Sequence, residues 1–166
     1  MAGRRVFFSF HYKEDVWRAS IVRNAGRFDA QAAAGWTDAS LWEETRRKGD
    51  TAIRHLIDNG LEGTSVTAVL IGSQTAQRNW VTYEIEKSKE RGNGIFGIYI
   101  HKIKDSNGNT CVRGDVPTAL ADYPVYKWDE SSLGRWVELA AINANKECLQ
   151  HNKKRCWQCK LRLRCC

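Results

Sequence analysis

The sequence predicts a single α/β domain with a five-stranded parallel sheet and helices on both faces. Short apolar segments alternate five times with segments of helical periodicity, which is typical of parallel strands joined by helices. The segment Val66–Ile71 is apolar at nearly every position, as a strand covered on both faces requires. The chain of 166 residues, 42% of them hydrophobic, is long enough to bury one core. For five such strands the expected order is 2-1-3-4-5.

The first strand is expected over Arg5–Phe10, and it leads into a polar and aromatic loop at Ser9–Tyr12. Helical spacing over Glu14–Phe28 then predicts a helix whose buried face is formed by Trp17, Ile21, Ala25 and Phe28. A short second strand is expected near Trp36-Thr37. The segment Asp38–Glu44 is interpreted as a loop anchored by its apolar side chains.

The second helix is expected to begin with Asp50 as its N-cap and to end at Gly60, burying Ile53, Leu56 and Ile57. The third strand, Val66–Ile71, follows it. After the polar connector Gly72–Asn79, another helix opens on Trp80, with Asn79 as its N-cap and Gly92 at its end.

The last third of the chain carries weaker signals. An apolar fourth strand is expected over Ile95–Ile100, and Gly, Asn and Asp residues mark a surface loop over residues 102–118. Val125–Trp128 is a weak fifth strand. Ser131 or Ser132 is expected to cap a final helix whose buried side chains are Trp136, Val137, Ala140 and Ala144.

The net charge of +7 is concentrated at the C-terminal end. Residues 146–166 carry about +6, so residues 1–145 are nearly neutral and no nucleic-acid-binding face is indicated. This divides the chain into a domain over residues 1–145 and a basic tail over residues 146–166. Five of the six cysteines lie in the tail, which is interpreted as a disordered basic segment or, alternatively, as a zinc site built from Cys148, His151, Cys156, Cys159, Cys165 and Cys166.

The chain has no stretch of eighteen apolar residues that would span a membrane, and its N-terminus lacks the apolar segment of a signal peptide. The sequence therefore predicts a cytoplasmic protein with no membrane partner.

The candidate site lies where the loops after strands 1 and 3 should converge. In a 2-1-3-4-5 sheet these loops leave neighbouring strands at the carboxyl edge, where ligands bind in open α/β sheets. Trp80 and Glu84 are four residues apart, so they share one face of the helix after strand 3. The sequence therefore predicts that the Trp80 ring and the Glu84 carboxylate lie beside both loops.

Three segments resemble bacterial TIR-like domains, and in particular the TIR-like proteins of the Thoeris anti-phage system: RVFFSFHY, DASLWEE and TSVTAVLIGSQTAQRNWVTYEIEKS. The resemblance covers roughly residues 4–100 and implies a flavodoxin-like three-layer sandwich. It also implies NAD cleavage, with Glu84 in the position of the catalytic glutamate and Trp80 one turn before it. Thoeris proteins of this kind respond to phage infection and make a cyclic ADP-ribose isomer, which activates a separate NAD-depleting effector.

The residue types suit this chemistry. Nicotinamide leaves NAD⁺ as a neutral group, and a nearby carboxylate stabilises the ribosyl cation that remains. Aromatic groups able to stack on nicotinamide or adenine are Phe10, Tyr12, Trp80 and Tyr83, while Ser9, His11 and Ser73 are candidate polar contacts. Asp38 either contacts the ligand or braces its own loop. NAD⁺ is the substrate, so no cofactor and no metal are expected.

Two other functional classes are compatible with a five-stranded parallel sheet. A phosphate-accepting receiver domain has the same strand order, but it needs acidic residues at its strand ends, and here strand 1 ends in Ser9-Phe10-His11. A non-enzymatic module that assembles with other TIR domains remains as the alternative, with self-association as its activity. Such a module has no need of a carboxylate beside an aromatic side chain.

Overall fold

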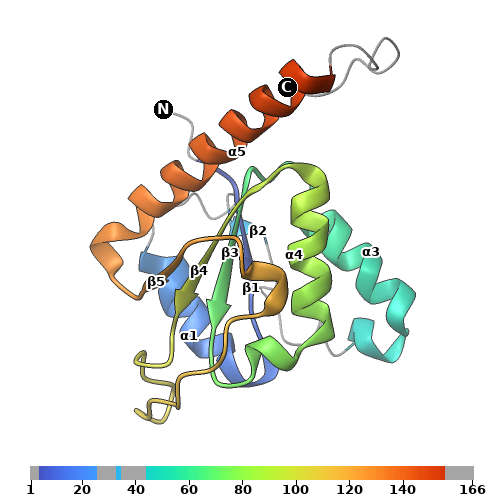
Figure 1. Cartoon of the computed structure of the whole chain (residues 1–166). Coiled ribbons are helices and arrows are strands. Elements are labelled where there is room, and N and C mark those ends of the chain that lie inside the picture. The colour runs from blue at the N-terminus through green and yellow to red at the C-terminus, as the bar shows by residue number, and fades with distance from the viewer. Residues whose placement is uncertain (1–3, 26–32, 35–43, 156–166) are drawn as a thin grey trace.

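The computed structural model describes residues 4–25, 33–34 and 44–155, with the backbone alone described at 33–34 and 147–155. The strands run parallel in one sheet, in the order β2-β1-β3-β4-β5 (Figure 1). Their bounds are β1 Val6–Ser9, β2 Ala33–Ala34, β3 Val66–Ile71, β4 Gly94–Tyr99 and β5 Val125–Lys127. The α/β class and the parallel sheet predicted from the sequence are confirmed.

Strand β3 lies at the centre of the sheet, and all six of its residues are buried. It pairs with β1 through Val6↔Val66 and with β4 through Val66↔Gly94. Its apolar, β-branched sequence suits a position covered on both faces. The carboxyl ends of β1 and β3 therefore lie side by side, and the chain leaves both strands at the same edge of the sheet.

Strand β2 is a minimal edge strand. Its two residues pair as Val6↔Ala33 and Phe7↔Ala34. The sequence placed this strand near Trp36-Thr37, which lies outside the described residues. A pair of alanines has no β-branched or aromatic signal, so nothing at Ala33-Ala34 marks a strand.

The helices whose full extent lies within the described residues are α1 Tyr12–Ala25, α3 Asp50–Leu61, α4 Asn79–Arg91 and α5 Leu133–Arg155, and they cover the sheet. On β3, Ala68 and Leu70 join the apolar cluster that contains α1 and α5 side chains, whereas Val69 and Ile71 pack with α4. Alternate residues of a strand point to opposite faces, so Ala68 and Leu70 lie on one face of the sheet and Val69 and Ile71 on the other. Figure 1 shows α3 and α4 beside each other at one side of the sheet and α5 across the other.

The predicted buried face of α1 is wrong. Trp17 is 51% exposed and Ile21 is 36% exposed, while Phe28 lies outside the described residues. The helix instead buries Tyr12, Asp15, Arg18, Ala19 and Val22. Charged residues such as Asp15 and Arg18 are normally found at the surface. In this fold they are buried as an ion pair, with 3.2 Å between Arg18 Nη1 and Asp15 Oδ1, and this explains why the apolar pattern indicates the wrong face.

The helix starts also differ from the sequence interpretation. Gly49 rather than Asp50 precedes α3, and Arg78 rather than Asn79 precedes α4, in both cases without a side-chain cap. Ahead of α5, the carboxylate of Asp129 accepts from the backbone N–H of Ser131 in a 3-10 turn at Glu130–Ser132. At the end of α4, Gly92 adopts a left-handed conformation at φ 74°, as predicted for a helix stop.

Helix α5 runs through residue 146, the predicted start of the tail, and continues to Arg155. Residues 156–166 lie outside the described part of the chain, as do the side chains of Cys148 and His151, so the zinc alternative stays untested. Among the described residues, no helix combines the length and the apolar character needed to cross a membrane.

Candidate active site

A cavity of about 540 Å³ opens where the loops after β1 and β3 meet the first turns of α4. Both loops and the helix supply its walls, as the sequence predicted from the strand order. The cavity is lined by Phe10, His11, Tyr12, Lys13, Glu14, Arg46, Gln74, Arg78, Trp80, Val81 and Glu84.

Glu84 is the buried carboxylate of this cavity. Only 2% of the residue is exposed, because it lies on the face of α4 that also buries Val81, Ile85 and Ser88. Ser9, the last residue of β1, is fully buried and donates its hydroxyl to Glu84 Oε2 at 2.5 Å. This short hydrogen bond holds the Glu84 carboxyl group at the carboxyl end of β1.

Trp80 lies one turn before Glu84, lines the cavity and is half-buried. Its ring meets Tyr83 edge-to-face at 5.9 Å between centroids, and the Arg54 guanidinium lies 4.8 Å from the Tyr83 ring centroid. The Tyr83 hydroxyl points to Asp58 on α3 at 3.4 Å. Tyr83 therefore packs between α4 and α3 and does not line the cavity, so the structure gives it a role in bracing Trp80.

The loop after β1 places three predicted side chains in the cavity. The rings of Phe10 and Tyr12 are 6.0 Å apart, and His11 lies between them in the chain. His11 Nδ1 is buried and has no hydrogen-bond partner among the described residues. Burial lowers the pKa of His11, and the charge of Arg78 lowers it further, so the imidazole is neutral at pH 7.

The loop after β3 supplies cationic and polar groups. Arg78 donates to the Gln74 side-chain oxygen, while its buried Nε has no partner within the part of the chain that the structure describes. Arg78, Lys13 and Arg46 line the same cavity and were not predicted as site residues. Arg78 had a recognisable signal, since it is the basic residue immediately before the helix that carries Glu84.

Three of the predicted binding residues that the structure describes do not line the cavity: Ser9, Ser73 and Tyr83. Ser73 follows Gly72 in the connector, but its side chain is not part of the cavity wall. Asp38 lies outside the described residues. Ser9 also does not line the cavity, and it reaches the site through its hydrogen bond to Glu84.

Gly72 is closely packed on two sides, by the Asp15 side chain and by the backbone at Gly114. A Cβ at Gly72 would lie 2.1 Å from Asp15 Oδ2, and a Cβ at Gly114 would lie 2.0 Å from the Gly72 carbonyl oxygen. Only glycine therefore fits at either position without a shift of the neighbouring segments. Burial raises the pKa of the Asp15 carboxyl, and the contact with Arg18 acts in the opposite direction.

Arg18 anchors the loop between β4 and β5. Its Nε donates to the carbonyl oxygen of Ile103 at 2.9 Å, and its Nη2 donates to the carbonyl oxygen of Asn109 at 3.1 Å. The side chain is 5% exposed. A single buried guanidinium thus fixes a surface loop to α1 next to the candidate site.

Comparisons with known proteins show the family of this chain. The family described as the TIR-like domain of the Thoeris protein ThsB matches residues 7–105, which is more than half of the chain. The chain belongs to this family. The resemblance stated from the sequence is therefore confirmed. The matched range contains β3, α4, all of β1 except Val6, and all the residues that line the cavity.

A relative of known name is similar over most of its length. It is the "Putative cyclic ADP-D-ribose synthase ThsB1" of Bacillus cereus (strain MSX-D12), which is 43% identical over 155 residues. The alignment covers 87% of this chain and 81% of the relative. The similarity extends well beyond the family's matched range and takes in most of the fold.

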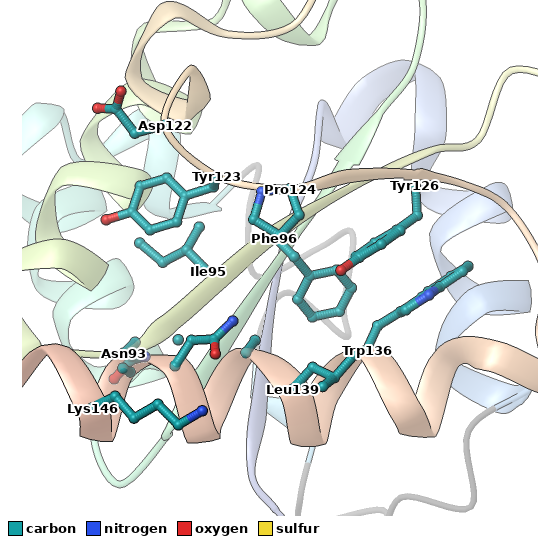
Figure 2. Close-up of a pocket in the computed structure, with 14 residues that line it drawn as sticks. Asn93, Ile95, Phe96, Asp122, Tyr123, Pro124, Tyr126, Trp136, Leu139 and Lys146 are labelled. Atoms are coloured by element: carbon teal, nitrogen blue, oxygen red, sulfur yellow. The ribbon is translucent and has the colours of Figure 1, made fainter.

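A second cavity of about 250 Å³ lies between α5 and the segment that leads into β5. Figure 2 shows Tyr126 and Trp136 in it, and their rings stack at 4.6 Å between centroids. Among the described residues, no buried polar atom without a partner lines this second cavity, whereas His11 Nδ1 and Arg78 Nε both line the first. The cavity beside Glu84 is thus the candidate active site of this TIR-like domain.

Proposed function

We propose that this ThsB-like protein cleaves NAD⁺ and closes the product into a cyclic ADP-ribose isomer that acts as a second messenger in Thoeris anti-phage defence. The observation that carries the proposal is the buried Glu84 carboxylate, which is held by Ser9 and flanked by Trp80 in a cavity open to ligand. The name of the Bacillus cereus relative, a cyclic ADP-D-ribose synthase, supports the same activity.

The proposed chemistry needs little from the protein beyond charge and position. The bond between the ribose anomeric carbon and the nicotinamide nitrogen breaks, and its electron pair leaves with nicotinamide, which becomes neutral. The ribosyl cation left behind is stabilised by the Glu84 carboxylate in a largely desolvated site. Glu84 therefore acts in the transition state more strongly than in the bound substrate, which is the condition for catalysis.

The remaining cavity residues suit the rest of NAD⁺. Trp80, Phe10 and Tyr12 offer aromatic surfaces for the nicotinamide and adenine rings. Lys13, Arg46 and Arg78 offer positive charge to the diphosphate, and Arg78 Nε, which has no partner among the described residues, is a donor suited to a phosphate oxygen. A cyclic product also requires that the adenosine half folds back toward the anomeric carbon, so both halves must be held in one closed site.

The same proposal defines the partners. NAD⁺ is the substrate rather than a cofactor, a phage component is the trigger, and the cyclic product acts on a separate NAD-depleting effector. The cytoplasm, which holds the NAD⁺ pool, is the proposed location. The enzyme is thus both an NAD⁺ nucleosidase, by the bond it breaks, and an ADP-ribosyl cyclase, by the bond it forms.

The test compares cells that carry the wild type, Glu84→Gln or Glu86→Gln, each challenged with phage. Glu86 lies two residues away on the same helix but is exposed, so its variant is the matched control. We expect cyclic ADP-ribose species and free nicotinamide, measured by mass spectrometry, to fall about 100-fold or more in Glu84→Gln alone.

Circular dichroism and thermal unfolding of the purified variants check that both remain folded. If Glu84→Gln makes as much product as the wild type, Glu84 is not the catalytic carboxylate. If neither the wild type nor the control makes product after challenge, the protein acts instead as a TIR assembly module.

A further inference from the structure

The His11 side chain is the one imidazole that lines the candidate site among the described residues. Its Nδ1 is buried and without a partner in the described part of the chain. Its backbone is fixed, because the carbonyl oxygen of His11 accepts from the N–H of Asp15 at 3.0 Å in the first turn of α1. His11 therefore lines the cavity from a fixed backbone position.

The surroundings of His11 keep it neutral. Burial is the largest cause of its lowered pKa, Arg78 and Lys13 add to the effect, and Glu14 opposes them. The charged groups that line the same cavity are Lys13, Glu14, Arg46, Arg78 and Glu84. A neutral imidazole has one nitrogen that accepts a proton, which is the state a general base needs near pH 7.

In the proposed reaction, no residue has yet been assigned the role of general base. Glu84 stabilises the ribosyl cation through its negative charge, and one of its oxygens already accepts the Ser9 hydroxyl. If Glu84 also took a proton from the attacking group, it would lose that charge while the cation is still present. An oxygen nucleophile, whether water or a ribose hydroxyl, must nevertheless lose its proton as the new bond forms.

We propose that His11 is the general base that accepts this proton. The inference rests on the proposed NAD⁺ cleavage. The nicotinamide–ribose bond breaks with its electron pair on nicotinamide, and the nucleophile's oxygen forms a bond to the anomeric carbon. The proton of that oxygen passes to a nitrogen of the His11 ring and from there to solvent. No oxidant or further reactant is needed.

If His11 is the general base, its loss should slow product formation without slowing cleavage of the nicotinamide–ribose bond. Without a base, the ribosyl cation is captured poorly by oxygen but still recombines with nicotinamide, which carries no proton to lose. Isotope-labelled nicotinamide should then continue to enter NAD⁺ while net product falls. Loss of the Glu84 charge, in contrast, should suppress exchange and product together, because it prevents formation of the cation.

The experiment supplies NAD⁺ and labelled nicotinamide to lysates of phage-challenged cells that express the full chain, with the Glu84→Gln lysate as the background. The variants are His11→Gln, His11→Asn and, as the matched control, His101→Gln. His101 also has a pKa lowered by burial but does not line the cavity. We expect the ratio of exchange to net product to rise about 100-fold in both His11 variants and to stay unchanged in His101→Gln.

The pH dependence of the exchange-to-product ratio in the wild type provides a second test. The same ratio should rise as the pH falls below 6.5, because a protonated His11 accepts no proton. The inference is overturned if the ratio of nicotinamide exchange to net product is the same in the His11 variants as in the wild type, which includes the case in which both fall by the same factor. If the wild type neither exchanges nicotinamide nor forms product above the background, the proposed function itself has failed.

Discussion

At the scale of single residues, the hydrogen bond between Ser9 and Glu84 joins the end of β1 to the second turn of α4. Both residues are buried, and 75 positions separate them in the chain. A buried carboxylate keeps its charge only if nearby donors replace water, and the Ser9 hydroxyl is one such donor. Ser9 is therefore a positioning residue for the proposed catalytic group.

Ser9→Ala should reduce formation of cyclic product by about 10-fold to 100-fold, since a hydrogen bond to a charged group contributes roughly 1.5–3 kcal/mol. Ser73→Ala is the control, because Ser73 lies in the neighbouring loop but does not line the cavity. Mass spectrometry of the product, normalised to folded protein, gives the comparison. Equal activity in the two variants would contradict the positioning role.

At the scale of elements, α1 illustrates what apolar spacing misses. Its outward face carries Val16, Trp17 and Ile21, whereas its buried face includes the Asp15–Arg18 ion pair. A periodic apolar pattern predicts the buried side only when buried positions are apolar. Here a charged pair fills two of them, so the pattern pointed to the wrong side.

The orientation of α1 is tested by comparing two Val→Ala variants of the same helix, one at a buried position and one at an exposed position. Val22 is fully buried and Val16 is 40% exposed, on the same helix. Val22→Ala should lower the free energy of unfolding by roughly 2 kcal/mol, because two methyl groups are lost and a cavity remains. Val16→Ala should change it by no more than about 0.5 kcal/mol. Urea denaturation measures both, and equal losses would show that the helix packs differently.

The strands were more predictable than the helix caps. The bounds of β3 agree with the prediction at both ends, because six consecutive buried positions leave a continuous apolar segment in the sequence. The predicted N-caps Asp50 and Asn79 instead lie inside their helices, and the residues before them, Gly49 and Arg78, make no side-chain capping hydrogen bond. Side-chain capping is one of several ways to begin a helix, so sequence alone does not fix that residue.

At the scale of the whole molecule, the alternation of strands and helices was enough to predict a parallel sheet and the meeting of two loops beside Glu84. The cationic side of the cavity was not predictable in the same way. Lys13, Arg46 and Arg78 come from three separate segments, and each looks like an ordinary surface residue in the sequence. Only the folded chain brings them to one wall.

Stability should depend on pH through two histidines. Burial lowers the pKa of His11 and of His101 in the folded state, below the value of 6.5 expected when the chain is unfolded. On acidification the unfolded chain therefore binds these protons first. The contribution to stability is fully present above pH 6.5 and is lost as the pH falls through 6.5 toward the folded-state values.

The measurement is the urea midpoint of unfolding between pH 7.5 and pH 5.5. The wild type should lose stability over this interval, and a double variant with His11→Gln and His101→Gln should lose less. The comparison between the two proteins removes contributions shared by other groups, including the carboxyl of Asp15. An identical pH dependence in both proteins would exclude the two histidines as its source.

The way in which Arg18 holds the loop after β4 has a consequence for how this protein diverges. Two of its donors bind main-chain carbonyl oxygens, at Ile103 and Asn109, and every amino acid provides such an oxygen. Substitutions in the loop therefore leave these two contacts intact, whereas a change in loop length moves the carbonyls out of reach. Homologues that retain the buried arginine should therefore conserve the number of residues in this loop more strictly than their identity, except at Asp105, whose carboxylate lies 3.5 Å from Arg18 Nη2.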